Sequence, residues 1–210
     1  TRHGPAPAAP PAAPNRPTGP AITTAGLTRV FGSGARARTV VDRLDLVAPP
    51  VARALTALAA QDPALASSAL VAPIDPDLAD TETMTRAFGM DLALSSNCIL
   101  VAGKRAGEER VAACVVRATT SADVNHVVKR LLDVRKASFW PQDRAVEASG
   151  MEYGGITPVG VPPQWRLLID SRCASGWSCI GSGLRASKLF VPGELLAALP
   201  AAEVVDGLGA

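Results

Sequence analysis

Runs of apolar residues separated by glycine, proline and charged residues predict a series of short β-strands. The clearest signal is a hairpin, because residues 98–102 and 111–116 are apolar and the charged stretch between them contains Gly103 and Gly107. Further apolar runs predict strands at residues 71–74, 167–170, 177–180, 188–191 and 203–205.

Capping residues and apolar residues at helical spacing predict the helices. One begins at Pro49, because proline fits the first turn of a helix. A second is capped by Asp80 and stopped by Gly89. Two more are expected at residues 142–149 and 193–199.

The most regular helical pattern follows Thr120 or Ser121, either of which is a suitable cap. Apolar residues recur there at i, i+3, i+4, i+7 and i+8, and the opposite face is polar. The apolar positions are Val124, Val127, Val128, Leu131 and Leu132, and the polar ones are His126, Lys129, Arg130 and Asp133. Helices and strands are mixed without strict strand–helix–strand alternation, so the predicted fold class is α+β.

The composition indicates one folded domain with a tail. The chain has 210 residues, of which 48% are hydrophobic and 19% charged, and this excludes a wholly disordered chain. Its apolar runs are too short for a membrane helix. The net charge is +2, but residues 98–150 carry nine basic and six acidic side chains. That basic middle could meet an anionic partner, although such an excess is usually only a solvated face.

Residues 1–25 form a tail rich in proline and alanine. Proline removes backbone donors and alanine buries little surface, so we expect this tail to be disordered or polyproline-like. A docking role for the tail is the alternative to a plain linker.

Four cysteines stand at positions 98, 114, 173 and 179, and none forms a Cys-x-x-Cys pair, which argues against a zinc ribbon. A hairpin turn centred on Ala106 would place Cys98 directly opposite Cys114. A disulfide is conceivable at that spacing, but two buried thiols in a reducing cytoplasm are the favoured interpretation. A cytoplasmic location is also expected because the sequence starts without the pattern of a secretory signal.

Residues suited to acid–base or metal chemistry are scarce. The chain has two histidines: His3 in the tail and His126 on an exposed helix face, so a Ser–His or Cys–His pair is not expected. No cluster has zinc or EF-hand spacing, and no glycine-rich nucleotide motif is present. We therefore expect no metal and no cofactor. Any reaction would depend on positioning and on polarisation by the backbone.

The most informative stretch is the loop at residues 150–160, with paired glycines at Gly154 and Gly155. Glycine lets a ligand approach the backbone closely and permits positive φ. Pro158 holds Thr157 in an extended conformation. A rigid loop of this kind suits a carboxyl ester or a phosphate, and an ordinary turn before a strand is the alternative.

The order of the motifs carries more information than any one of them. The hairpin opens with Asn-Cys-Ile-Leu at Asn97, and Gly-Gly-Ile-Thr-Pro follows at residues 154–158. A strand then ends at Asp170 and leads to Gly-Ser-Gly at residues 181–183. This order resembles the YbaK family, the free-standing relatives of the editing domain of bacterial prolyl-tRNA synthetases.

The resemblance implies a single α+β domain over residues 70–208, with a mixed, partly barrel-like β-sheet flanked by helices. Residues 26–69 would be an N-terminal extension with a helix. The implied activity is trans-editing: hydrolysis of the ester in mischarged aminoacyl-tRNA, without cofactor or metal. The implied partners are the CCA end of aminoacyl-tRNA and, optionally, a synthetase, with no membrane and no DNA.

The resemblance also implies a set of substrate-binding residues. The glycine–proline loop lines the aminoacyl pocket in this family, the strand-end acid lies near it, and the later glycine turn lies beside the terminal adenosine. The corresponding residues are Asn97, Gly154, Gly155, Ile156, Thr157, Pro158, Asp170, Gly181, Ser182 and Gly183. No catalytic side chain is assigned, and the backbone of Gly154, Gly155 and Ile156 is the expected catalytic element.

Asn97 departs from the family pattern, because many members carry a lysine there. Asparagine has no charge to meet a phosphate. Either Asn97 orients the ester differently, or a nearby base such as Lys136 compensates, or activity is reduced. An active hydrolase is the favoured hypothesis. The alternatives are a non-catalytic tRNA- or protein-binding relative and a structural module that uses the tail.

Some aromatic and basic residues could contact RNA, although core packing and solvated faces are the simpler explanations. Tryptophans could stack on bases and basic side chains could follow phosphates. The residues concerned are Trp140, Trp165 and Trp177, and Arg117, Lys129, Arg130, Arg135 and Lys136.

The tail lacks the apolar surface needed to offset the entropy of ordering it. A shortened chain that begins at Leu27 should therefore keep the melting temperature and the activity of the full chain. Thermal unfolding of the two chains tests this, and a drop of several degrees would show that the tail packs on the domain.

Overall fold

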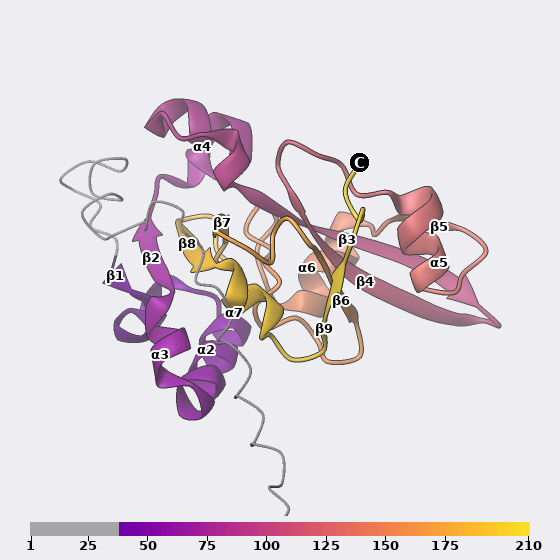
Figure 1. Cartoon of the computed structure of the whole chain (residues 1–210), viewed down its shortest axis with the longest axis horizontal. Helices are drawn as coiled ribbons and strands as arrows, with labels where there is room; N and C mark the ends of the chain where they lie inside the picture. Colours follow the sequence, from indigo (N-terminus) through magenta and orange to yellow (C-terminus); the bar gives the residue numbers. More distant parts are fainter. Residues whose placement is uncertain (1–37) are drawn as a thin grey trace, which may run out of the picture.

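The computed structural model describes residues 38–210, in which the strands form two sheets (Figure 1). The four-stranded sheet has the order β1-β2-β8-β7, and the five-stranded sheet has the order β5-β3-β4-β6-β9. The sheets meet where Ser95 bridges Cys179. The α+β class is confirmed, but the strands are divided between two sheets and do not close into a barrel. The sequence-predicted tail lies outside the described residues.

The four-stranded sheet is antiparallel throughout and is covered by two helices that precede most of it in the chain. Figure 1 shows these helices together beside the sheet. The strands are β1 (Arg38–Thr39), β2 (Leu70–Pro73), β7 (Trp177–Gly181) and β8 (Ser187–Pro192), and the helices are α2 (Pro49–Gln61) and α3 (Pro63–Ser68).

Helix α2 is part of the main core. It begins at Pro49 as predicted, and it buries Val51 and Leu55 completely. Both side chains belong to the same apolar cluster as Ile169 of the other sheet. Residues 38–69 therefore pack into the domain that follows them.

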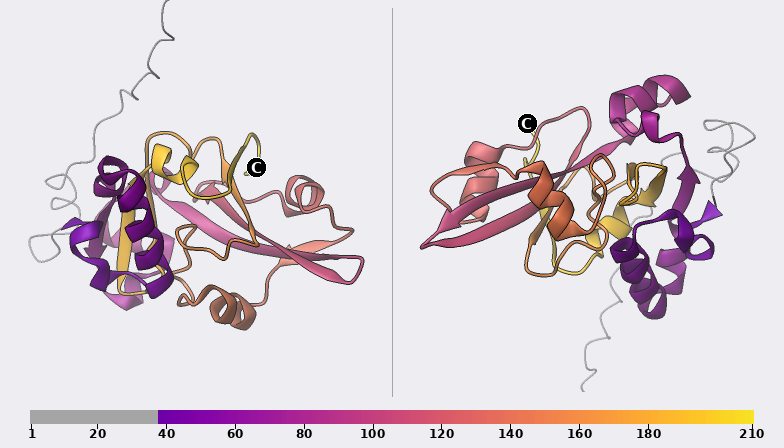
Figure 2. Two further views of the ribbon diagram at one scale, coloured as in Figure 1. Left: turned by 90° about the horizontal axis from the view of Figure 1, so that it is seen from below. Right: turned by 180° about the vertical axis from the view of Figure 1, so that it is seen from behind.

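The five-stranded sheet is built on the long hairpin. Strands β3 and β4 pair antiparallel along their full length, and β4, β6 and β9 are parallel neighbours. In Figure 2 the tip of this hairpin extends well away from α2. The strands are β3 (Ser96–Arg105), β4 (Glu108–Arg117), β5 (Ala137–Phe139), β6 (Arg166–Asp170) and β9 (Ala202–Val205).

The hairpin turn consists of two residues, Ala106 and Gly107, both with positive φ (51° and 87°). Such a turn matches the twist of the strands. It shifts the register by one residue from the predicted turn centred on Ala106. The prediction that Cys98 lies opposite Cys114 is therefore wrong.

Cys98 instead pairs with Val115, so its side chain lies on the opposite face of the sheet from that of Cys114. Both thiols are free, as expected. Burial raises the pKa of Cys98 and raises that of Cys114 to about 12. These thiols are poor nucleophiles at neutral pH.

Side-chain caps mark the start of two of the remaining helical segments. The Asp80 carboxylate accepts a hydrogen bond from the Thr83 N–H at the start of α4, and Gly89 ends that helix with φ 60°. The helix expected after Thr120 or Ser121 begins instead with a π-helical turn, which Asp123 caps by accepting a hydrogen bond from the His126 N–H at 3.0 Å. The helices are α4 (Thr81–Phe88), α5 (Lys129–Leu131, after the turn Val124–Val128), α6 (Gln142–Ser149) and α7 (Gly193–Ala197).

No helix within residues 38–210 is long and apolar enough to cross a membrane.

The packing of α2 into the common core predicts a large loss of stability on truncation of Leu55. Leu55→Ala should lower the free energy of unfolding by about 2–5 kcal/mol, because it leaves a cavity in a closed core. Arg53→Ala on the exposed face of the same helix should change it by less than about 0.5 kcal/mol. Denaturant unfolding of both variants is the measurement. An equal, small effect would mean that α2 is only an appendage.

Candidate functional site

A cavity of about 480 Å³ opens where the two sheets meet. Its walls come from the start of α4, the start of β3, the β5–α6 segment, the glycine loop and strands β7 and β8. Much of the surface is apolar and comes from Met84, Ile99, Leu100, Ile156 and Ile180. The cavity therefore offers an apolar surface to which a few polar groups are added.

Lys188 of β8 contributes a buried ammonium group to this cavity. The side chain is only 5% exposed, and its Nζ donates a hydrogen bond to the Ala79 carbonyl at 2.7 Å. Burial lowers the pKa of Lys188, although the nearby Cys179 and Asp80 partly oppose that shift. Within residues 38–210 the other two ammonium protons have no hydrogen-bond acceptor.

Asn97 and Ser95 add two more polar groups to the same wall. The Oδ1 of Asn97 accepts a hydrogen bond from the Thr81 hydroxyl at 2.9 Å, which leaves its NH₂ group to donate elsewhere. The Ser95 hydroxyl is buried and has no hydrogen-bond partner within the described residues. A buried polar group without a partner is costly, so a ligand atom at this point would relieve that cost.

Two of the predicted loop residues, Gly154 and Ile156, line the cavity, and Gly181 joins them from β7. Gly155 does not line it. Its N–H donates to the Glu152 carbonyl at 2.9 Å, and a Cβ added there would lie 2.7–2.9 Å from backbone atoms of Leu184. The absence of a side chain at Gly155 therefore makes room for the neighbouring turn and not for a ligand.

The other predicted residues of the two loops lie behind the cavity wall. Thr157 and Pro158 are buried. The Ser182 hydroxyl shares a hydrogen bond of 2.7 Å with that of Ser187. Gly183 donates its N–H to the Gly155 carbonyl at 2.7 Å. The bond from Gly183 to Gly155 joins the two loops, whereas the Ser182 hydroxyl bonds within the β7–β8 connection and the buried Thr157 hydroxyl has no partner within the described residues. A direct role for Thr157, Pro158, Ser182 and Gly183 in substrate binding stays a prediction.

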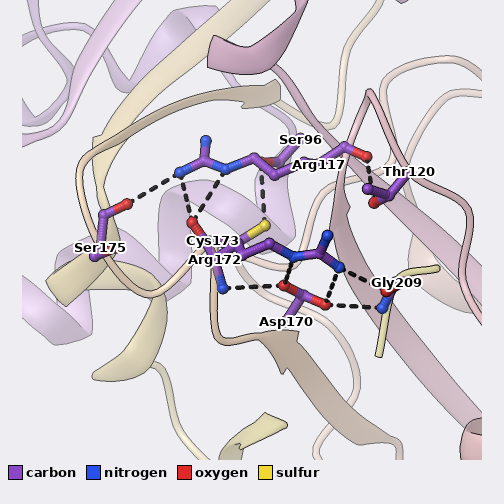
Figure 3. Close-up of polar contacts among 8 residues, drawn as sticks. All are labelled: Ser96, Arg117, Thr120, Asp170, Arg172, Cys173, Ser175 and Gly209. Carbon is purple, nitrogen blue, oxygen red and sulfur yellow. Dashed lines mark hydrogen bonds and ion pairs between the residues drawn. The ribbon is translucent and has the colours of Figure 1, made fainter. Parts of the chain in front are cut away.

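Asp170 lies outside the cavity lining, in a cluster that joins the end of β6 to the C-terminal residues (Figure 3). Its carboxylate is fully buried and accepts hydrogen bonds from the Arg172 guanidinium at 2.8 and 2.9 Å and from the Gly209 N–H at 2.8 Å. Burial acts to raise the pKa of Asp170, but these hydrogen bonds outweigh it and the pKa is lowered. A substrate contact for Asp170 stays a prediction, because its carboxylate already has these partners.

Arg117 belongs to the same cluster (Figure 3). Its guanidinium donates to the carbonyl oxygens of Arg172, Ser175 and Trp177. These bonds fix the loop between β6 and β7. Arg117 therefore has a structural role where the sequence also allowed a phosphate contact.

The sequence of residues 75–199 matches the family model for the aminoacyl-tRNA editing domain. The chain belongs to this family. The matched segment contains all of the cavity-lining residues. No curated protein sequence matches the chain.

Solved structures share the fold of this editing domain. A structure described as a "putative trans-editing enzyme for prolyl tRNA synthetase" has a TM-score of 0.61 at 17% identity and covers 76% of this chain and 97% of its own. A scaffold protein from epitope grafting by computational design has a TM-score of 0.60 at 17% identity, covering 78% and 99%. The hypothetical protein APE2540 has a TM-score of 0.55 at 22% identity, covering 66% and 86%.

Lys188 and Ser95 of the editing domain were not found from the sequence. The available signal for Lys188 is a lysine within an otherwise apolar strand, since long charged side chains are rarely buried without a function. Ser95 follows a short 3₁₀ turn, and nothing in its sequence context distinguishes this buried serine from an exposed one.

The bonds of Asp170 predict a structural defect on its substitution. Asp170→Asn should lower the free energy of unfolding by about 1–3 kcal/mol, because it weakens the charge-assisted bonds to Arg172. Asp45→Asn, at an exposed carboxylate paired with Arg43, should have almost no effect. Denaturant unfolding compares the two. Equal stability of Asp170→Asn and the parent would leave the carboxylate free for a role in the substrate site.

The lowered pKa of Lys188 predicts a pH effect with a definite sign. Between the lowered pKa and the ordinary value of 10.5, the unfolded chain binds more protons at this lysine than the folded chain does. The stability of the parent relative to Lys188→Met should therefore rise as the pH increases through that window. Unfolding of both proteins between neutral pH and about pH 10 measures this difference. A flat or falling difference would show that the ammonium is not buried.

Proposed function

We propose that this editing domain is a trans-acting hydrolase that cleaves the ester of mischarged aminoacyl-tRNA. The observation that carries the proposal is the cavity at the sheet junction, where an apolar surface adjoins unpaired donors on Lys188, Asn97 and Ser95. The apolar surface suits an amino-acid side chain, and the donors suit the ester carbonyl. Discrimination in a synthetase pocket is worth only about 1–3 kcal/mol per methylene, which is why a second, hydrolytic site is useful.

In the proposed reaction, water attacks the ester carbonyl carbon and negative charge develops on the carbonyl oxygen. The bond from that carbon to the ribose oxygen then breaks, and the ribose oxygen takes up the proton that the attacking water releases, so that the free amino acid and the 3′-terminal hydroxyl group are formed. Protonated Lys188 and the Asn97 amide are placed to donate to the oxygen as charge develops. A fixed donor of this kind typically contributes about 10²–10³ in rate.

Lys188 also accounts for the uncharged Asn97. The Lys188 ammonium donates to the Ala79 carbonyl, and the Asn97 amide oxygen accepts from the Thr81 hydroxyl. The two side chains, which come from different sheets, therefore both bond the short segment at the start of α4. We propose that the charge which other members of the family place at position 97 comes here from β8. A second lysine at position 97 would lie near Lys188, and the two like charges would repel each other.

The backbone of the glycine loop completes the proposed site. Gly154 and Ile156 line the cavity and are the proposed backbone contacts of the aminoacyl group. Gly155 has a structural role in the loop, because its backbone packs closely against that of Leu184.

A second candidate function is binding without catalysis, and Asn97 is the observation that favours it. A binding-only relative would hold the aminoacylated CCA end in the same cavity. Its affinity would depend on Lys188, but it would not accelerate hydrolysis.

Deacylation of a panel of mischarged tRNAs distinguishes these functions. The parent should hydrolyse at least one of them, and Lys188→Met should lower kcat/KM by about 100-fold or more. Lys129→Met, a matched change outside the cavity lining, should keep the parent rate. His126→Ala should also keep it, because the His126 side chain is exposed and its imidazole bonds only Asp123 among the described residues.

Thermal unfolding of each variant separates a catalytic defect from a loss of fold. Hydrolysis of no tRNA in the panel by the parent would favour the binding-only relative. An unchanged rate in folded Lys188→Met would remove the ammonium from the mechanism.

A further inference from the structure

Two aromatic side chains at the cavity are unusually exposed. Phe139 of β5 is 67% exposed and Tyr153 of the glycine loop is 56% exposed, and both line the cavity. Most large apolar side chains within the described residues are covered, so two exposed rings at one site require an explanation. Neither contributes to the core clusters of the domain.

A basic groove adjoins this cavity. It has a volume of about 500 Å³ and is lined by the basic side chains of Lys104, Arg135, Lys136 and Arg144. One acidic residue, Glu109, lies among them, and it is already paired with Arg144 at 2.5 Å. Within residues 38–210 no ion pair engages Arg135 or Lys136, and both are exposed. The groove therefore carries an excess of positive charge.

Trp140 lies between the cavity and the basic groove, because it lines both. Its ring packs edge-on against Trp165 at 5.2 Å, and the Arg144 guanidinium lies over it at 5.1 Å. These contacts fix the indole as a rigid wall between cavity and groove. Strand β5 runs along the same boundary, with Lys136 just before it and Phe139 at its end.

We propose that the single-stranded 3′ end of an RNA lies across this boundary, with its last bases stacked on Phe139 and Tyr153 and its preceding phosphates in the basic groove. This path rests on the proposed function, because it delivers a terminal ribose to the cavity. Exposed rings provide a stacking surface for any base, and the unpaired cations of the groove match the charge of the phosphates.

Binding of a short fluorescent RNA that ends in single-stranded ACCA tests the stacking surface. Phe139→Ser and Tyr153→Ser should each weaken binding about fivefold or more, which is the usual size of a lost base–aromatic contact. Val204→Ser removes a comparably exposed apolar side chain on β9 and should leave the affinity unchanged. Unchanged affinity in both aromatic variants would overturn the proposal. The proposal would also be overturned if adenosine monophosphate displaced the fluorescent RNA as well as unlabelled RNA does, because that result would indicate a site for a single nucleotide.

The salt dependence of the same binding tests the groove. The double variant Arg135→Gln, Lys136→Gln should reduce the slope of log affinity against log salt by about 1.4, or about 0.7 for each lost phosphate contact. Arg53→Gln, at an exposed arginine of α2, should keep the parent slope. If the salt dependence of the double variant were as steep as that of the parent, the path through the groove would be contradicted.

These measurements use uncharged RNA, so they are independent of hydrolysis. A parent that binds RNA through these residues but hydrolyses no aminoacyl-tRNA would support the path and contradict the proposed function. The opposite result would be hydrolysis by the parent together with an RNA affinity that does not change in the variants of Phe139, Tyr153, Arg135 and Lys136. It would support the proposed function and contradict the path.

Discussion

The close contact between two glycine turns is the constraint on which the site depends. The Gly155 carbonyl accepts the Gly183 N–H at 2.7 Å, and the Gly183 carbonyl accepts the Glu152 N–H at 2.8 Å. A Cβ added at Gly181 would lie 2.3 Å from the Gly155 oxygen, so a larger residue there would force the turns apart. Because one turn lines the cavity and the other connects β7 to β8, this contact sets where β8 presents its side chains.

The position of Lys188 follows from that contact, and its burial has a cost. An ammonium group buried in the cavity wall loses hydration, which is the main reason the pKa of Lys188 is lowered. One backbone carbonyl compensates only part of that loss. An apolar residue at this position would make the domain at least as stable, so stability alone does not explain the lysine. The retained charge is accounted for if a substrate oxygen occupies the cavity during the reaction.

Local patterns in the sequence predicted most of the elements but not how they converge. The caps at Asp80 and Gly89 and the apolar runs of β2, β7 and β8 are local signals, and they predicted the elements to within a few residues. The hairpin register was missed by one residue because it depends on the conformation of the turn and not on apolar spacing.

In the site, too, some features could be predicted from local sequence patterns and others depend on the tertiary fold. Asn97, Gly154, Ile156 and Gly181 lie on the cavity lining, and their contact with a substrate stays a prediction. Asp170 is bonded within a separate cluster: Arg172 lies two residues away in the chain, but Gly209 is brought to it only by the fold. Lys188 lies in an apolar strand whose pattern does not show which way its side chain points. The chemistry of the cavity therefore became visible only in three dimensions.

The most direct test of the central claim is a crystal structure of the domain with a non-hydrolysable aminoacyl-adenosine, in which an amide replaces the ester. The account predicts that the aminoacyl group occupies the cavity between the sheets, with its carbonyl oxygen about 2.7–3.2 Å from the Lys188 ammonium. A ligand bound elsewhere, or a carbonyl oxygen out of reach of both Lys188 and Asn97, would contradict it.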